Sequence, residues 1–146
     1  MKTIQDIIET IRKNKTQLGI TLYEPAHDYD IENFEQELNI KLPDDIKAFY
    51  RFCNGFESEE DMFRIIPLEE ILYNKSKYIT NEFYIAEYMV YCDMWTVSVN
   101  DTDNSYNISI LTNSFTEFLD RFIQGGVFEE NGLYAWRDKI NKIKQQ

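Results

Sequence analysis

Residues 31–56 read IENFEQELNIKLPDDIKAFYRFCNGF, and this stretch carries the clearest structural pattern in the chain. Its apolar residues recur at helical spacing in two groups, and helix-breaking residues follow each group. The first group is Phe34 and Leu38, the second is Ile46, Phe49 and Tyr50, and the breaks are Leu42-Pro43 and Asn54-Gly55. The stretch therefore predicts two short amphipathic helices separated by a turn.

The rest of the chain predicts strands bracketed by helices. Helices are expected at 2–18, at 44–53 with Asp44 as N-cap, from Ser114 to Gly125 and at 133–146, and Asp30 is expected to cap the helix that contains Phe34. Residues 22–29 and 57–61 are expected to be loops, 62–66 the first strand, and 68–73 a helical turn or short helix. Residues 83–99 and the alternating Tyr106, Ile108 and Ile110 complete the strands. This order predicts an α+β fold, a single domain over residues 1–146 with a largely antiparallel central sheet flanked by helices.

Length and composition limit the class of protein. At 146 residues the chain can bury about two-thirds of its unfolded surface as one domain. No apolar run approaches the roughly 20 residues that span a bilayer, so no membrane association is expected. The first 18 residues lack a small-residue cleavage site, which makes a cytoplasmic location the expectation. Cys53 and Cys92 lie in apolar surroundings without paired spacing, and both are interpreted as reduced core thiols.

The net charge of −11 is distributed unevenly along the chain. Residues 24–132 hold 7 basic and 23 acidic side chains, a net charge of −16, whereas both ends are basic. Such a surface repels phosphate backbones, so direct nucleic-acid binding is not expected. It would attract a basic protein, although acidity can also serve solubility alone.

The sequence offers little for catalysis or metal binding. His27 is the only histidine, and it is interpreted as a surface or loop-tying residue. Residues 101–105 begin like a calcium loop, but Tyr106 and Thr112 occupy the positions that require glycine and glutamate. No phosphate-binding glycine loop is present, since Gly125-Gly126 follows a predicted helix. We therefore expect no enzymatic activity, no metal and no cofactor.

Aromatic and acidic residues together favour protein binding. The chain has 10 Phe, 10 Tyr and 2 Trp, more than one small core readily encloses, and tyrosine is common at interface anchors. The tyrosines at 84, 88 and 91 lie in one segment with Glu82, Glu87 and Asp93, although half-buried strand positions would also explain them.

These motifs resemble the SMI1/KNR4, or SUKH, superfamily. The resemblance rests on residues 31–56 and continues through Pro67-Leu68-Glu69-Glu70-Ile71, Trp95, Ser114-Phe115-x-Glu117-Phe118-Leu119 and Gly125-Gly126, so that it covers about residues 28–126. Bacterial members of the superfamily are mostly immunity proteins, so the resemblance implies a noncatalytic protein that binds a cognate toxin domain, a nuclease being one candidate. Residues 86–95 depart from the Gly/Asp-rich turn of many members, which leaves the subfamily open.

Two other functions remain open. Fungal members of the superfamily imply a regulatory or scaffold module, and a small-molecule site would require an apolar pocket. For toxin binding, the candidate residues are acids in loops or near strand ends, together with the tyrosine run. They are Glu57, Glu59, Glu60, Asp61, Asp93, Asp101 and Asp103, with Tyr84, Tyr88 and Tyr91.

Overall fold

The computed structural model describes residues 2–78, 80–89, 92–100, 102–103, 105–109 and 111–144. Its helices are α1 (Ile4–Asn14), α2 (Asp28–Leu38), α3 (Asp44–Phe52), α4 (Leu68–Tyr73), the 3-10 turn η1 (Lys75–Lys77), α5 (Phe115–Gly125) and α6 (Leu133–Lys144). Its strands are β1 (Ile20–Leu22), β2 (Phe56–Ser58), β3 (Phe63–Ile65), β4 (Glu82–Tyr88), β5 (Asp93–Val99) and β6 (Tyr106–Ile108).

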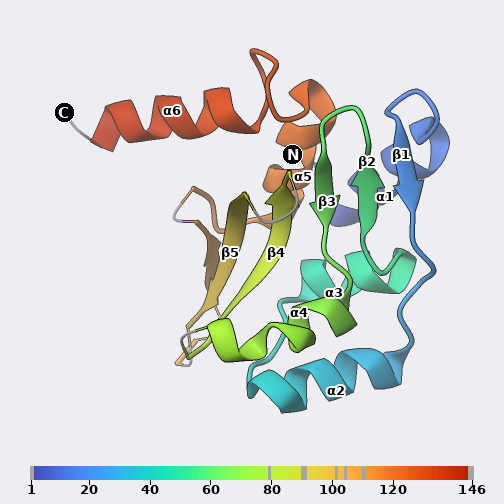
Figure 1. Cartoon of the computed structure of the whole chain (residues 1–146), viewed down its shortest axis with the longest axis vertical. Coiled ribbons are helices and arrows are strands. Elements are labelled where there is room, and N and C mark those ends of the chain that lie inside the picture. The colour runs from blue at the N-terminus through green and yellow to red at the C-terminus, as the bar shows by residue number, and fades with distance from the viewer. Residues whose placement is uncertain are drawn as a thin grey trace.

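The six strands form one antiparallel sheet in which every strand pairs with its neighbours in sequence order (Figure 1). The connections β2–β3, β4–β5 and β5–β6 are short, whereas the connection β1–β2 carries α2 and α3 and the connection β3–β4 carries α4 and η1. The expected α+β fold with a largely antiparallel sheet and flanking helices is confirmed.

An aromatic core fills the space between one face of the sheet and the helices α1, α3 and α5. Phe63 of β3 stacks on Phe122 of α5 with ring centroids 4.3 Å apart, and Trp95 of β5 lies edge-on to Phe118 at 5.9 Å. On α3, Phe49 contacts Phe115 at 5.2 Å. All of these rings are buried, so the core connects α3, the helix before the polar turn at 54–55, with α5, the helix that begins after Ser114.

The opposite face of the sheet carries a polar row. Glu57 of β2 lies opposite Arg64 of β3, Arg64 lies opposite Glu87 of β4, and Glu87 lies opposite Met94 of β5. Directly opposed residues point to the same face of a sheet, so these side chains form one line across it. In Figure 1, α2 and α4 lie at one end of the sheet, and the β2–β3 turn and α6 lie at the other.

Two strands precede the expected first strand. Residues 20–22 and 56–58 form β1 and β2, so the expected loops at 22–29 and 57–61 are each partly strand. Each strand has three residues, too short for alternation to be recognised, and both are held by pairing partners that are distant in sequence. The expected strand at 62–66 shortens to β3.

Two expected helix caps were wrong. His27, not Asp30, is the N-cap of α2, and the Asp30 carboxylate instead accepts a hydrogen bond of 3.0 Å from the His27 backbone N–H. Pro43 is the N-cap of α3, which makes Asp44 its first residue. In both cases the acidic residue lies inside the first turn of the helix, where its negative charge interacts favourably with the helix dipole.

Other expectations were confirmed. Residues 68–73 form α4, and the Ser114 hydroxyl accepts a hydrogen bond of 3.1 Å from the Glu117 N–H at the start of α5. Cys53 is buried, which raises the pKa of its thiol to about 12.

Cys92 is exposed, so its interpretation as a core thiol was wrong. It lies in the connection between β4 and β5. Ile110 lies outside the described residues.

Candidate functional site

The four acidic candidates at 57–61 lie together on β2 and the turn to β3. Glu57 accepts a hydrogen bond of 3.1 Å from the Tyr23 hydroxyl. Glu59 and Glu60 are exposed, and neither side chain has a hydrogen bond or ion pair with any other described residue. These two carboxylates are therefore available to a partner.

Asp61 has a structural role at the same turn. Its carboxylate accepts hydrogen bonds from the Val127 N–H at 3.4 Å and from the Ser58 hydroxyl at 3.5 Å. The first contact joins the β2–β3 turn to the segment after α5, which is 66 residues away in sequence. Asp61 therefore positions the surface that Glu59 and Glu60 occupy.

The structure separates the tyrosine candidates. Tyr88 lies opposite Phe63 near the β2–β3 turn, and its ring is edge-on to Phe128 at 5.2 Å. Tyr84 lies further back on β4, where it contacts Tyr78 at 4.9 Å. Both tyrosines are half-buried, and only Tyr88 lies close to the acidic turn. Tyr91 lies outside the described residues.

The carboxylates of Asp93 and Asp103 both accept hydrogen bonds within the protein, and Asp93 lies opposite Tyr88 on the neighbouring strand. Asp93 accepts hydrogen bonds from the Tyr134 hydroxyl at 2.8 Å and from Arg137 Nη1 at 3.1 Å, so it attaches α6 to the sheet. Burial, together with the hydrogen bond to Asp93, raises the pKa of Tyr134 to about 12. Asp103 accepts hydrogen bonds from Ser105 within the β5–β6 turn, and these lower the pKa of its carboxyl. Asp101 lies outside the described residues.

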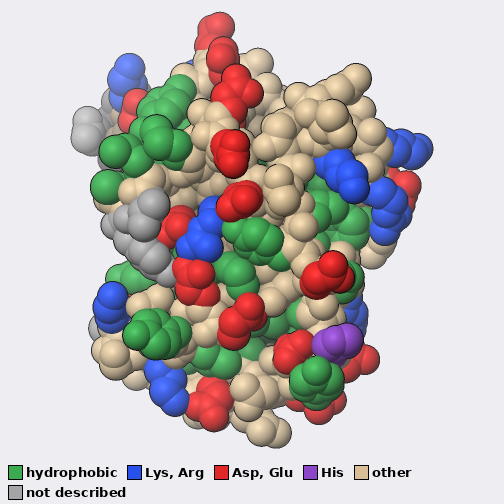
Figure 2. Space-filling model, turned by 45° about the vertical axis from the view of Figure 1, so that its right-hand side comes forward, with side chains coloured by type: hydrophobic (Ala, Val, Ile, Leu, Met, Phe, Trp, Pro, Cys, Tyr) green, Lys and Arg blue, Asp and Glu red, His purple; other side chains and the backbone are tan. Residues whose placement is uncertain are grey.

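Sequence reasoning missed the apolar part of this surface. Met62 and Met89 are 51% and 46% exposed, and the Met89 N–H donates a hydrogen bond of 2.8 Å to the Met62 carbonyl. Phe128, which contacts Tyr88, is 59% exposed. On the face shown in Figure 2, acidic side chains run from the top towards the centre and hydrophobic side chains lie beside them. The local sequence around a single methionine in a turn does not indicate whether its side chain will be exposed.

A surface hollow of about 300 Å³ links the methionines to the acids. Its lining includes Glu57, Glu59, Met62, Phe63 and Met89. Arg64 and Glu87 also border the hollow.

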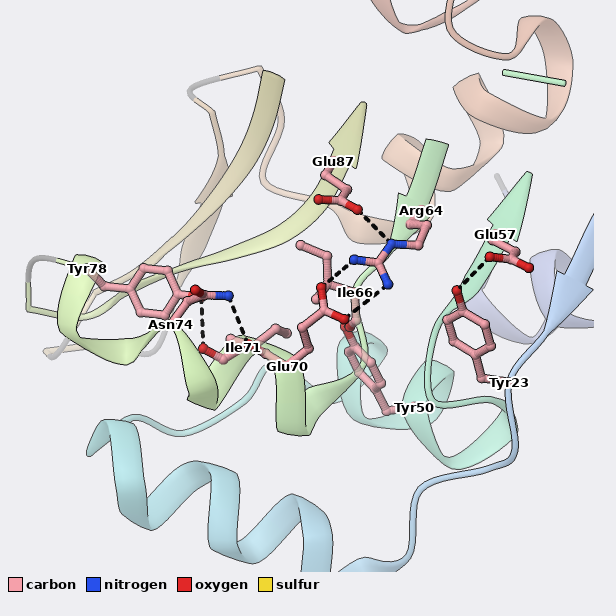
Figure 3. A network of polar contacts seen from close by, with 10 residues as sticks. All are labelled: Tyr23, Tyr50, Glu57, Arg64, Ile66, Glu70, Ile71, Asn74, Tyr78 and Glu87. Carbon is pink, nitrogen blue, oxygen red and sulfur yellow. Dashed lines mark hydrogen bonds and ion pairs between the residues drawn. The ribbon is translucent and has the colours of Figure 1, made fainter. Parts of the chain in front are cut away.

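Arg64, in the polar row, binds two carboxylates, one from the same row and one from α4 (Figure 3). Its Nε donates to Glu87 at 2.6 Å, and its terminal nitrogens bind both carboxylate oxygens of Glu70 on α4. Burial opposes the charge on Arg64, but hydrogen bonds to Glu70 and Glu87 outweigh it and raise the guanidinium pKa. The cation is therefore neutralised within the protein, which leaves the nearby surface acidic.

The described residues hold no constellation for metal or histidine chemistry. Among them, no group of three or more His, Cys, Asp or Glu side chains could hold a metal ion. His27 stacks on exposed Tyr29 at 5.1 Å beside the start of α2. No helix in the described part of the chain is long and apolar enough to cross a membrane.

The fold and this surface define a small α+β protein with an acidic, partly apolar face at one end of an antiparallel sheet. The sequence profile of the SMI1 / KNR4 family (SUKH-1) matches residues 25–110, more than half of the chain, and the protein belongs to this family. The matched range runs from just before α2 to the end of β6. No curated protein sequence matches the chain.

Proposed function

We propose that the protein is an immunity protein that binds and neutralises a cognate bacterial toxin domain by noncatalytic contact. Membership of the SUKH-1 family supports a role of this kind. The observation that carries the proposal is that Glu59 and Glu60, whose carboxylates have no partner among the described residues, lie beside exposed Met62 and Met89. Charged groups that steer a partner and apolar groups that anchor it are the two parts of a typical protein interface.

The charge of the molecule favours a toxin with a basic surface. Residues 24–132 carry a net charge of −16, which accelerates encounter with a cationic partner at low ionic strength. A nuclease is the candidate that fits best, because its active site must attract phosphates. Carboxylates docked on such a site would occupy the positions of substrate phosphates and so block it without any chemical step.

We propose further that the whole chain acts as one domain in the cytoplasm. Helices α1 and α6 lie outside the matched range, yet each packs on the core. Ile7 and Ile11 of α1 are buried, and Leu133 and Trp136 of α6 are buried as well. Both ends therefore complete the fold that presents the surface.

Co-expression with the toxin domain encoded next to the gene tests the proposed function. Rescue of growth, followed by purification of a stable 1:1 complex, is the expected result. A catalytically dead toxin domain should form the same complex, because inhibition requires binding alone. If an active toxin is neither neutralised nor bound, the immunity function is wrong, and a regulatory scaffold role takes its place.

A further inference from the structure

The backbone at Met62 and Met89 is unusual. Their φ angles are +53° and +56°, in the left-handed region that glycine and asparagine favour. The other non-glycine residues with positive φ among those described are two asparagines and a serine, Asn39, Asn81 and Ser109. Glycine would fit both methionine positions with less strain, so the retained side chains point to a role outside folding.

The two methionines act as one unit. The hydrogen bond from the Met89 N–H to the Met62 carbonyl, 2.8 Å long, joins the β2–β3 turn to the end of β4. Both methionines line the 300 Å³ hollow, together with Phe63. Methionine is flexible and polarisable, which suits contact with the irregular surface of another protein.

Phe128 extends the apolar surface. Tyr88 links it to the methionines, because Tyr88 contacts the Phe128 ring, lies opposite Phe63 and directly precedes Met89. The Asp61 hydrogen bond to the Val127 N–H fixes the Phe128 segment against the β2–β3 turn. The three exposed apolar side chains therefore lie at the same end of the sheet, with the two methionines lining the hollow and Phe128 outside its lining.

The rim of this surface is acidic. Glu59 and Glu60 follow β2, and Glu129 and Glu130, both exposed, follow Phe128. Arg64 beside the hollow is already paired with Glu70 and Glu87. A second copy of this chain would bring like charges together across a two-fold interface, whereas a basic protein would complement them.

We infer that Met62, Met89 and Phe128, rimmed by Glu59, Glu60, Glu129 and Glu130, form the surface on which the toxin domain docks. An apolar side chain of the toxin enters the hollow between the two methionines, and lysines or arginines around it meet the rim. This inference rests on the proposed function and adds the surface through which it operates.

Glycine substitutions test the anchors without disturbing the fold. Met62→Gly and Met89→Gly remove the side chains and leave a backbone that accepts positive φ, so thermal stability should stay close to wild type. The affinity for the toxin domain encoded beside the gene, measured by calorimetry with a catalytically dead toxin, should fall at least tenfold in the double variant. Tyr73→Ala is the matched control, because this 87% exposed ring on α4 lies outside the surface.

Charge reversal tests the rim. Glu59→Lys with Glu60→Lys should slow association several-fold at low salt and flatten its dependence on salt concentration. Glu32→Lys and Asn33→Lys on α2 introduce cations at exposed positions of the opposite end, and they should have a much smaller effect.

The outcomes separate the surface from the function. If wild-type protein binds the toxin and the methionine double variant binds equally tightly, the inferred surface is wrong and the immunity function stands. Dimerisation of the free protein through the methionines, detected by ultracentrifugation and lost in the double variant, would overturn a toxin-docking role. If the wild-type protein does not bind the toxin, the proposed function and the inferred surface fail together.

Discussion

Arg64 is the residue whose loss should cost the most stability among the charged side chains of the sheet. Its side chain is 24% exposed, and that of its partner Glu87 is only 3% exposed. Arg64→Ala would leave carboxylates at the surface of the sheet without their shared cation. We expect a loss of about 2–3 kcal/mol in the free energy of unfolding, measured by urea denaturation.

Arg51→Ala provides the control for this prediction. Arg51 also pairs with a carboxylate, that of Asp28 at 3.1 Å, but both side chains are mostly exposed. Exposed pairs of this kind contribute at most about 1 kcal/mol. Equal losses in the two variants would mean that burial does not determine the contribution of Arg64.

At the scale of single residues, the sequence predicted candidates but not their surroundings. Glu59 and Glu60 could be selected because they lie in an acidic turn, and the structure leaves both exposed. Asp93 has the same chemistry, yet Tyr134 and Arg137 occupy its carboxylate from α6, a contact across more than 40 residues. No local pattern distinguishes a free acid from one that a distant helix has engaged.

Gly55 determines how α3 connects to β2. Its φ is +97°, and an added Cβ would lie 2.3 Å from the Ile65 carbonyl oxygen, closer than any real contact. Gly19, which precedes β1, has a φ of +67°, but an added Cβ would meet nothing closer than 4.0 Å. Comparing alanine at the two sites therefore separates backbone strain from steric clash.

We expect Gly19→Ala to cost about 1 kcal/mol, the strain of a left-handed alanine. Gly55→Ala should cost about 3 kcal/mol or more, because the Ile65 backbone must move as well. Thermal unfolding followed by circular dichroism measures both. Similar midpoints for the two variants would contradict the close approach of Gly55 to β3.

At the scale of elements, the sequence predicted the helices better than the strands. Eleven-residue helices such as α5 repeat their apolar residues over three turns, and Ser114 marks the start of this one. By contrast, β1 and β2 have three residues each, and they exist because β1 pairs with β2 and β2 pairs with β3. Three residues contain too few apolar positions to show an alternating pattern. These strands are therefore determined by their pairing partners and not by local sequence.

At the scale of the molecule, the inferred surface is assembled from segments that are far apart in the chain. Met62, Met89 and Phe128 come from three connections, and only the sheet order and the Asp61 contact bring them together. The sequence did predict the negative charge of the surface, because the excess of acidic residues between 24 and 132 can be counted from the composition. The apolar centre could not be predicted, since it depends on which turns meet at the end of the sheet.

The buried tyrosines should make the whole molecule sensitive to alkali. Burial raises the pKa of Tyr50 well above its usual value of 10.0, and its hydroxyl donates a hydrogen bond of 2.7 Å to the Ile66 carbonyl. The unfolded chain releases the Tyr50 proton near pH 10, whereas the folded protein retains it. Stability from this group is therefore complete below pH 10 and is lost as the pH rises, by about 1 kcal/mol between pH 10 and 11.

Tyr50→Phe isolates this contribution. Below pH 10 the variant should be about 1 kcal/mol less stable than wild type, because the Ile66 carbonyl loses its donor. Above pH 10 the difference should shrink and then reverse, since phenylalanine has no proton to release. Tyr106 and Tyr134, whose pKa values are also raised by burial, remain in both proteins, so their contributions cancel in the comparison. Tyr73→Phe alters an exposed ring and should follow the wild-type curve throughout. Urea denaturation midpoints measured from pH 8 to 11 give the stability curves of the three proteins. If the difference in stability between wild type and Tyr50→Phe stays constant with pH, the Tyr50 hydroxyl ionises as readily in the folded protein as in the unfolded chain, and the prediction is wrong.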